Sequence, residues 1–228
     1  MRCARSVGGG REERWRRVLA GIALVALLVG ASRGIAEIDA AGVEPTGPAV
    51  GALAPDFALT PLRFYDFRLD AREITRTNAW ELYEPVRLGA FRNKWPVALV
   101  FGSAASVPRA DALALEALQR RFADRVQFLF VYIREGNPIP GAEARREPDT
   151  HLERIRIANA FVSGMSVSIA CVVDGMDDAT MKTYAAAPAR VYVVEKKGRI
   201  AFASDPAAGL DFGGLEAALV SVAAISSP

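Results

Sequence analysis

The sequence predicts an α/β domain in which a central mixed sheet is flanked by helices and preceded by an N-terminal extension. Three apolar runs have the length and composition of strands buried on both faces: Val97–Phe101, Val126–Ile133 and Val167–Val173. Helical patterns separate these runs, and right-handed crossovers of this kind make consecutive strands parallel. A hairpin follows the third run, so we expect antiparallel strands at one side of the sheet.

The N-terminal half is expected to supply the first strands and helices. Val50–Leu59 opens the domain with a turn and a short strand, and residues 60–90 predict loop with short strands. The helix Pro108–Phe122 has apolar residues at spacings of three and four, and Ser106 is placed to cap it. Residues 134–148 are polar and carry three prolines, which indicates a loop.

The C-terminal half is expected to complete the sheet and cover it. Its predicted elements are two helices or helical turns, a hairpin and a closing helix, in this order: His151–Val162, Asp178–Tyr184, the strands Arg190–Val194 and Ile200–Ala203, and Leu215–Ala224.

Residues 1–36 are predicted to be a signal peptide or an N-terminal membrane anchor. A basic stretch ends at Arg17, and Val18–Ser32 is an uncharged run of fifteen residues, whereas a bilayer span takes roughly 20. Cleavage and anchoring through residues 18–32 both stay open, and either places the domain in the periplasm or outside the cell. Residues 37–49 are expected to be a linker, and residues 50–224 the domain.

Charge and composition exclude nucleic acid as a partner. Of the 28 basic and 26 acidic residues, seven and two lie in residues 1–36, which leaves 21 and 24 and a net charge of −3. Cys3 and Cys171 are the two cysteines, and they form no CxxC motif. With His151 as the single histidine and no Cys/His cluster, neither a metal nor another cofactor is expected.

The acidic cluster of Asp174, Asp177 and Asp178 suggests a calcium site by its composition. It lacks the alternating ligands of a calcium-binding loop. We therefore expect a solvated turn.

Three segments resemble the iodothyronine deiodinases and their bacterial relatives, a branch of the redoxins in the thioredoxin-like superfamily. The first, PVALVFGSAASVP at 96–108, is similar to the family's active-site segment. The others are VYIREGNP at 131–138 and CVVDGMDDATMKTYAAAPARVYVVEKKGRIAF at 171–202, and VGALAPDF at 50–57 is typical of redoxins. Several motifs in one order make the resemblance specific. It implies a thioredoxin-like fold and, in the family, oxidoreductase chemistry at the turn after the first buried strand.

Three positions depart from the chemistry that the resemblance implies. Ser106 stands at the family's selenocysteine or cysteine, Ala104 at a second thiol, and Asn137 at the histidine that donates a proton. A serine hydroxyl is a poor nucleophile without an adjacent base, and an amide does not titrate near pH 7. The glycines, prolines and apolar frame of the motif are retained.

The resemblance also assigns structural or cleft positions. Pro188 matches the cis-proline that faces the turn, and Ser103, Asp174 and Tyr184 match other residues of the motifs. Arg190 either contacts an anion beside the turn or pairs with Asp174, and the sequence leaves both open.

Two classes of function follow. One is a non-catalytic binding or structural protein that takes a protein or small-molecule ligand in the thioredoxin-like cleft. The other is an enzyme: a redoxin-type oxidoreductase that reduces disulfides or peroxides through Cys171 or a partner's thiol, or a hydrolase built on Ser106 with His151 as base. Because a cysteine in an apolar strand is usually inert and capping accounts for Ser106, the first class is favoured, with His151 at the surface.

Overall fold

The computed structural model describes residues 46–62, 84–136, 138–165 and 168–225. All of them belong to one of the two units into which the chain divides, Pro45–Pro228. The predicted export segment, residues 1–36, lies outside the described residues, as does most of the predicted linker. Among the described helices, none has the length and apolar character that a bilayer crossing requires.

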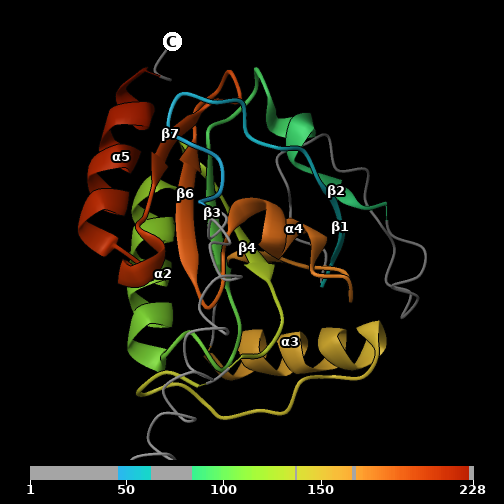
Figure 1. Cartoon of the computed structure of the whole chain (residues 1–228). Coiled ribbons are helices and arrows are strands. Elements are labelled where there is room, and N and C mark those ends of the chain that lie inside the picture. The colour runs from blue at the N-terminus through green and yellow to red at the C-terminus, as the bar shows by residue number, and fades with distance from the viewer. Residues whose placement is uncertain (1–45, 63–83, 137, 166–167, 226–228) are drawn as a thin grey trace, which may run out of the picture. The chain divides into compact units, whose positions relative to one another are not determined.

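Seven strands form one mixed sheet in the order β2-β1-β5-β4-β3-β6-β7 (Figure 1). In chain order the strands are β1 (Ala58–Pro61), β2 (Val86–Arg87), β3 (Val97–Gly102), β4 (Gln127–Tyr132), β5 (Ala170–Val173), β6 (Arg190–Val194) and β7 (Ile200–Ala203). The strands β3, β4 and β5 pair in parallel, as predicted, and the remaining pairs are antiparallel. The hairpin of β6 and β7 forms one edge, which confirms the expected mixed sheet.

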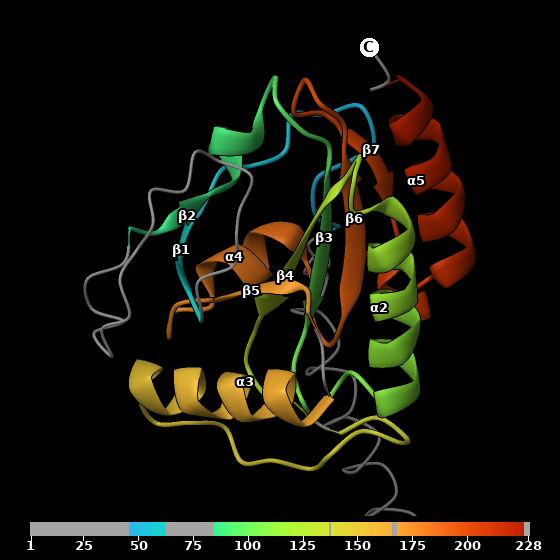
Figure 2. The same ribbon diagram turned by 180° about the vertical axis from the view of Figure 1, so that it is seen from behind.

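Helices cover both faces of this sheet. They are α2 (Arg109–Phe122), α3 (His151–Met165), α4 (Ala179–Tyr184) and α5 (Phe212–Ile225), with the 3-10 helices η2 (Leu88–Phe91) and η3 (Pro206–Ala208). In Figure 1, α2 and α5 lie to the left of the sheet and α4 to the right, and Figure 2 shows the same layers from behind. The predicted helices are therefore all present, within a few residues of their expected ends.

The side chains of the strands alternate between the two faces of the sheet and so form two separate apolar clusters. Ala98 and Val100 of β3 pack in the cluster with α2, α3 and α5, whereas Leu99 and Phe101 pack in the cluster with α4 and residues before β3. Successive side chains of a strand point to opposite faces, so an uninterrupted apolar run is required when both faces are covered. The turn after β3 carries the candidate site, and its residues Ala104 and Val107 pack in the first of these clusters.

Candidate functional site

The turn between β3 and α2 is closed to solvent. Residues 103–107 are each at most 2% exposed. The hydroxyl oxygen of Ser106 accepts a hydrogen bond from the Ser103 amide at 2.8 Å, and the amides of Ser106 and Val107 donate to the Ser103 carbonyl at 3.1 and 3.0 Å. The predicted helix cap is wrong: Pro108 is the N-cap of α2, without a side-chain hydrogen bond, because the Ser106 hydroxyl is used inside the turn.

Gly102, the last residue of β3, allows the turn to pack this closely. A Cβ atom at Gly102 would lie 2.5 Å from Cγ2 of the buried Val107. We expect Gly102→Ala to lower the free energy of unfolding by about 1–3 kcal/mol, because a β-branched side chain in a packed core cannot move aside. Unfolding in a chemical denaturant measures this free energy. The matched control is Gly136→Ala, whose Cβ would meet no atom within 4 Å, and an equal loss in both variants would contradict this packing.

Two polar side chains at the end of β4 bind the remaining amides of the turn. The Ala104 amide donates to the Tyr132 hydroxyl oxygen at 3.1 Å, and the Ala105 amide donates to the Glu135 carboxylate at 3.0 Å. The Tyr132 hydroxyl in turn donates to the other oxygen of Glu135, which is 3% exposed. Burial, with the neighbouring carboxylate, raises the pKa of Tyr132, so this hydroxyl stays protonated.

Every amide from residue 103 to residue 107 therefore has an acceptor within the protein. An oxyanion hole needs amides that are free to meet developing charge, and this turn offers none. Sequence reasoning missed both Tyr132 and Glu135. The sequence offered one signal, the acidic Glu135 just after an apolar strand. A carboxylate that is buried at such a place requires hydrogen-bond donors around it.

Residues 138–143, here called the covering segment, lie across the turn. The Ile139 amide donates to the Ala105 carbonyl at 3.0 Å, and the Glu143 amide donates to the Ala104 carbonyl at 3.1 Å. These two bonds occupy carbonyl groups of the turn and contribute to its burial. Asn137, the predicted replacement for the proton donor, lies outside the described residues, so its role stays a prediction.

Four charged side chains form a closed ring of ion pairs at the two ends of the loop that carries the covering segment. Arg154 pairs with Glu147 at 2.7 Å and with Asp178 at 3.0 Å, and Arg134 lies 3.9 and 3.6 Å from the same two carboxylates. Arg154 is 1% exposed and also donates to the Gly175 carbonyl at 2.6 Å. The ring joins β4, the loop, α3 and the start of α4, and the sequence did not predict it.

The prediction of a solvated acidic turn is wrong for two of its three residues. Asp174 is buried, and its carboxylate accepts hydrogen bonds from the amides of Thr180 and Met181 at the start of α4. Asp178 is buried in the ion-pair ring, and Asp177 alone is exposed. The described residues contain no group of three His, Cys, Asp or Glu side chains arranged to hold a metal ion.

Arg190 binds backbone carbonyl groups, and its predicted contact with an anion stays a prediction. Its buried guanidinium donates to the carbonyls of Ser204, Thr46 and Tyr184 at 2.8, 3.0 and 3.1 Å. No ion pair joins Arg190 to Asp174 within the part of the chain that the structure describes, so that predicted pairing is wrong. Arg190 instead ties β6 to the segment that enters the domain.

Two buried tyrosines lie beside this arginine. Tyr192 donates to the Tyr184 carbonyl at 2.5 Å, and Tyr184 donates to the Pro55 carbonyl at 2.5 Å. Burial raises the pKa of both hydroxyls, that of Tyr192 to about 12. The Ala187–Pro188 peptide bond is cis, as the resemblance implied.

The alternative catalytic groups are poorly placed for chemistry. Cys171 is 0% exposed, and burial raises the pKa of its thiol. His151 is half-buried at the start of α3, rather than at the surface as predicted, and its Nε2 atom has no hydrogen-bond partner among the described residues. The Ser106 hydroxyl makes its contacts with atoms of Ser103, so no Ser–His pair forms in the described part of the chain.

The fold and the retained turn define a thioredoxin-like protein, and comparisons with known proteins specify the branch. A family model described as iodothyronine deiodinase matches residues 87–209, more than half of the chain. The chain therefore belongs to the iodothyronine deiodinase family. No curated protein matches it by sequence.

Solved structures share the fold at low sequence identity. The chain is similar to a thiol:disulfide interchange protein from Bacteroides sp., with 14% identity, a TM-score of 0.51, and 78% of this chain and 91% of that chain covered. It is also similar to Peroxidoxin BcpB from Mycobacterium tuberculosis, with 16% identity, a TM-score of 0.51, and coverages of 79% and 99%. These likenesses support the thioredoxin-like fold alone.

Proposed function

We propose that this protein is an exported, non-catalytic member of the deiodinase family with a binding or structural role. The observation that carries the proposal is the turn at residues 103–107, which holds no thiol and uses all its amides in internal hydrogen bonds beneath the covering segment. Redox enzymes of this fold class need an accessible thiolate at such a turn. A ligand in the thioredoxin-like cleft would be a protein or a small molecule bound without thiol chemistry.

The enzymatic alternatives have less support. An oxidoreductase that acts through Cys171 would need an exposed thiol with a low pKa, whereas this thiol is buried and its pKa is raised. A hydrolase built on Ser106 would need a base within about 3.2 Å of the hydroxyl, whereas the hydroxyl contacts Ser103.

Export is part of the same proposal and rests on the sequence. The basic stretch and the uncharged run Val18–Ser32 have the order and length of an export signal. Comparing the protein in cell fractions with and without residues 1–36 tests this part independently of catalysis.

Activity assays test the non-catalytic role. Wild-type protein with dithiothreitol as reductant is expected to reduce disulfides and hydrogen peroxide, and to deiodinate iodothyronines, no faster than dithiothreitol alone. The physical reason is that neither Ser106 nor the buried Cys171 can present a thiolate to these substrates. Initial rates at several protein concentrations give the measurement.

Two variants identify the group responsible if turnover is found. Loss of turnover in Cys171→Ala would establish the redoxin alternative, and loss in Ser106→Ala would establish a serine-dependent enzyme; either result overturns the proposal. The variant Ala104→Cys/Ser106→Cys/Asn137→His restores the three family groups. If this variant is active and the wild type is not, the result would support the proposal that the protein keeps the family's fold but has lost its catalytic groups.

A further inference from the structure

The end of the sheet opposite the turn carries a second surface. Because β3 runs from Val97 to Gly102, its start lies at the other end of the domain from the turn. Three segments meet there: residues 49–54, residues 92–95 and the turn 195–199 between β6 and β7. The bonds that join them are Asn93 N to Lys196 O at 2.7 Å and Ala54 N to Gly198 O at 2.9 Å.

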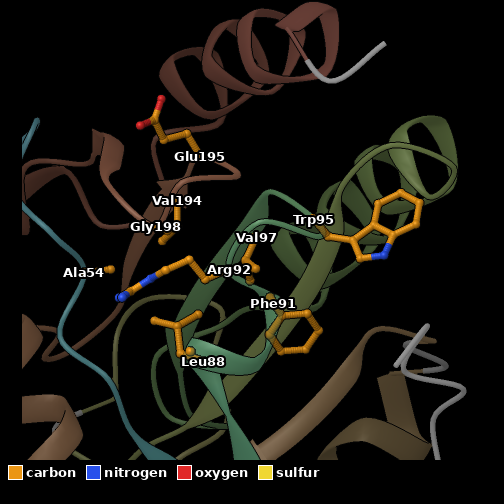
Figure 3. A pocket seen from close by; sticks show the side chains of 10 residues that line it. Ala54, Leu88, Phe91, Arg92, Trp95, Val97, Val194, Glu195 and Gly198 are labelled. Atoms are coloured by element: carbon orange, nitrogen blue, oxygen red, sulfur yellow. The ribbon is translucent and has the colours of Figure 1, made fainter. Parts of the chain in front are cut away.

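Five exposed cations gather on these segments. We call the group the basic end, and its members are Arg92, Lys94, Lys196, Lys197 and Arg199. None of the five forms an ion pair within the described residues, whereas exposed arginines of α2 such as Arg120 and Arg121 are paired with glutamates. The three segments hold a single carboxylate, Glu195, and Figure 3 shows it directed away from Arg92. A second carboxylate, that of Asp56, accepts a hydrogen bond from the Gly89 amide beside the hollow at 2.7 Å, so the five cations exceed the neighbouring carboxylates by three.

Apolar side chains stand among these cations. Val50 is 63% exposed and Leu53 is 53% exposed, so both are large hydrophobic side chains that face solvent. Leu53 pairs with Arg199 in an isolated β-bridge, and the Arg199 guanidinium donates to the Gly51 carbonyl at 2.8 Å. Cations and apolar groups thus share one surface.

A shallow hollow, open to solvent, adjoins the basic end. Figure 3 shows the Arg92 side chain extending along it toward Ala54 and Gly198, with Leu88 below. The guanidinium is therefore held close to the domain by its aliphatic stem while its charge stays at the surface.

We propose that the basic end docks on the surface of a bilayer that contains anionic phospholipids. The cations would meet the lipid phosphates, and Val50 and Leu53 would enter the boundary between headgroups and acyl chains. An acidic protein is less favoured, because contact with carboxylates alone leaves the two exposed apolar side chains unexplained. The predicted export segment Val18–Ser32 would bring the chain to a membrane in any case.

Vesicle sedimentation tests this docking. Residues 45–228 contain the whole sheet and both apolar clusters, so this segment has its own core and can be used without the export segment. It is expected to sediment with vesicles of phosphatidylglycerol and phosphatidylcholine in equal parts, and at least about tenfold more weakly with phosphatidylcholine alone. Raising the salt concentration should weaken the binding, because ions screen exposed charges.

A charge-matched pair of variants localises the surface. Lys94→Gln/Lys196→Gln/Lys197→Gln removes three lysines for which no side-chain hydrogen bond is found among the described residues, so the fold should be kept. Binding to the anionic vesicles is expected to fall by about tenfold or more. The control, Arg120→Gln/Arg125→Gln/Arg156→Gln, removes three exposed cations from elsewhere and should change binding by less than about threefold. A third variant, Val50→Ser/Leu53→Ser, should weaken binding several-fold at unchanged charge.

Four results would overturn the proposal: no binding to anionic vesicles, equal binding to both kinds of vesicle, equal loss in the two charge variants, or displacement by inorganic phosphate beyond the effect of sodium chloride at equal ionic strength. The last result would mean that the basic end holds a free anion instead of a lipid surface. None of these readouts depends on whether the turn is catalytic.

Discussion

Replacing Arg154 by methionine is expected to lower the free energy of unfolding by about 3–5 kcal/mol, because it removes the buried partner of the buried Asp178 carboxylate and of the half-buried Glu147 carboxylate. The change leaves the carboxylates of Glu147 and Asp178 with Arg134 alone, at 3.9 and 3.6 Å, and leaves the Gly175 carbonyl without its donor. Denaturant unfolding followed by circular dichroism gives the value.

A neighbouring arginine supplies the control. Arg156 lies on the same helix, is exposed and forms no ion pair in the described part of the chain, so Arg156→Met should change the free energy of unfolding by less than about 0.5 kcal/mol. A loss below about 1 kcal/mol in Arg154→Met would contradict a role of the ring in holding the loop.

A thiol introduced at the covered turn is expected to react slowly. In a Cys3→Ser background, the Ser106→Cys protein should react with an aromatic disulfide reagent at least about 100-fold more slowly than the Ser221→Cys protein, which corresponds to an opening free energy of about 3 kcal/mol. The reason is that position 106 is 2% exposed beneath the covering segment, whereas position 221 is exposed on α5. Absorbance of the released thiol reports the rate.

The native thiol of Cys171 serves as an internal reference for global unfolding, since it is wholly buried. Adding Arg154→Met to Ser106→Cys should accelerate labelling at position 106 more than labelling of Cys171, because the loop loses its attachment. Equal acceleration of both thiols would indicate global destabilisation only. Rapid labelling at position 106 without Arg154→Met would contradict the closed turn and remove the main support for a non-catalytic role.

The sheet was predictable because its signals are local. The run Val97–Phe101 and the helical spacing over residues 108–122 each lie within a few residues of chain, and the structure has β3 and α2 there. A strand that is buried on both faces of the sheet requires an unbroken apolar run, so the positions of these runs in the sequence predict the positions of the buried strands. The same holds for the hairpin of β6 and β7, whose turn residues are contiguous.

The polar contacts of the site were not predictable, because their partners are distant in sequence. Asp178 is buried against Arg154, which lies 24 residues earlier, and also pairs with Arg134, and no local pattern distinguishes it from the exposed Asp177. Ser106 has the right spacing for a helix cap, yet its hydroxyl binds the Ser103 amide, a choice that depends on the geometry of the turn. The role of Glu135 likewise depends on a distant residue, because its carboxylate accepts a hydrogen bond from the Ala105 amide, 30 residues earlier in the chain.

The loop between β4 and α3 is held at both ends by the same four charges, and its middle touches the turn through two backbone bonds. Lengthening a chain whose ends are fixed in this way costs little conformational entropy, since the closure cost grows only logarithmically with loop length. The stretch between Pro138 and Arg146 can therefore change in length while both attachments of the loop are kept. Insertions there would alter what covers the turn and leave the strands and helices beneath it in place.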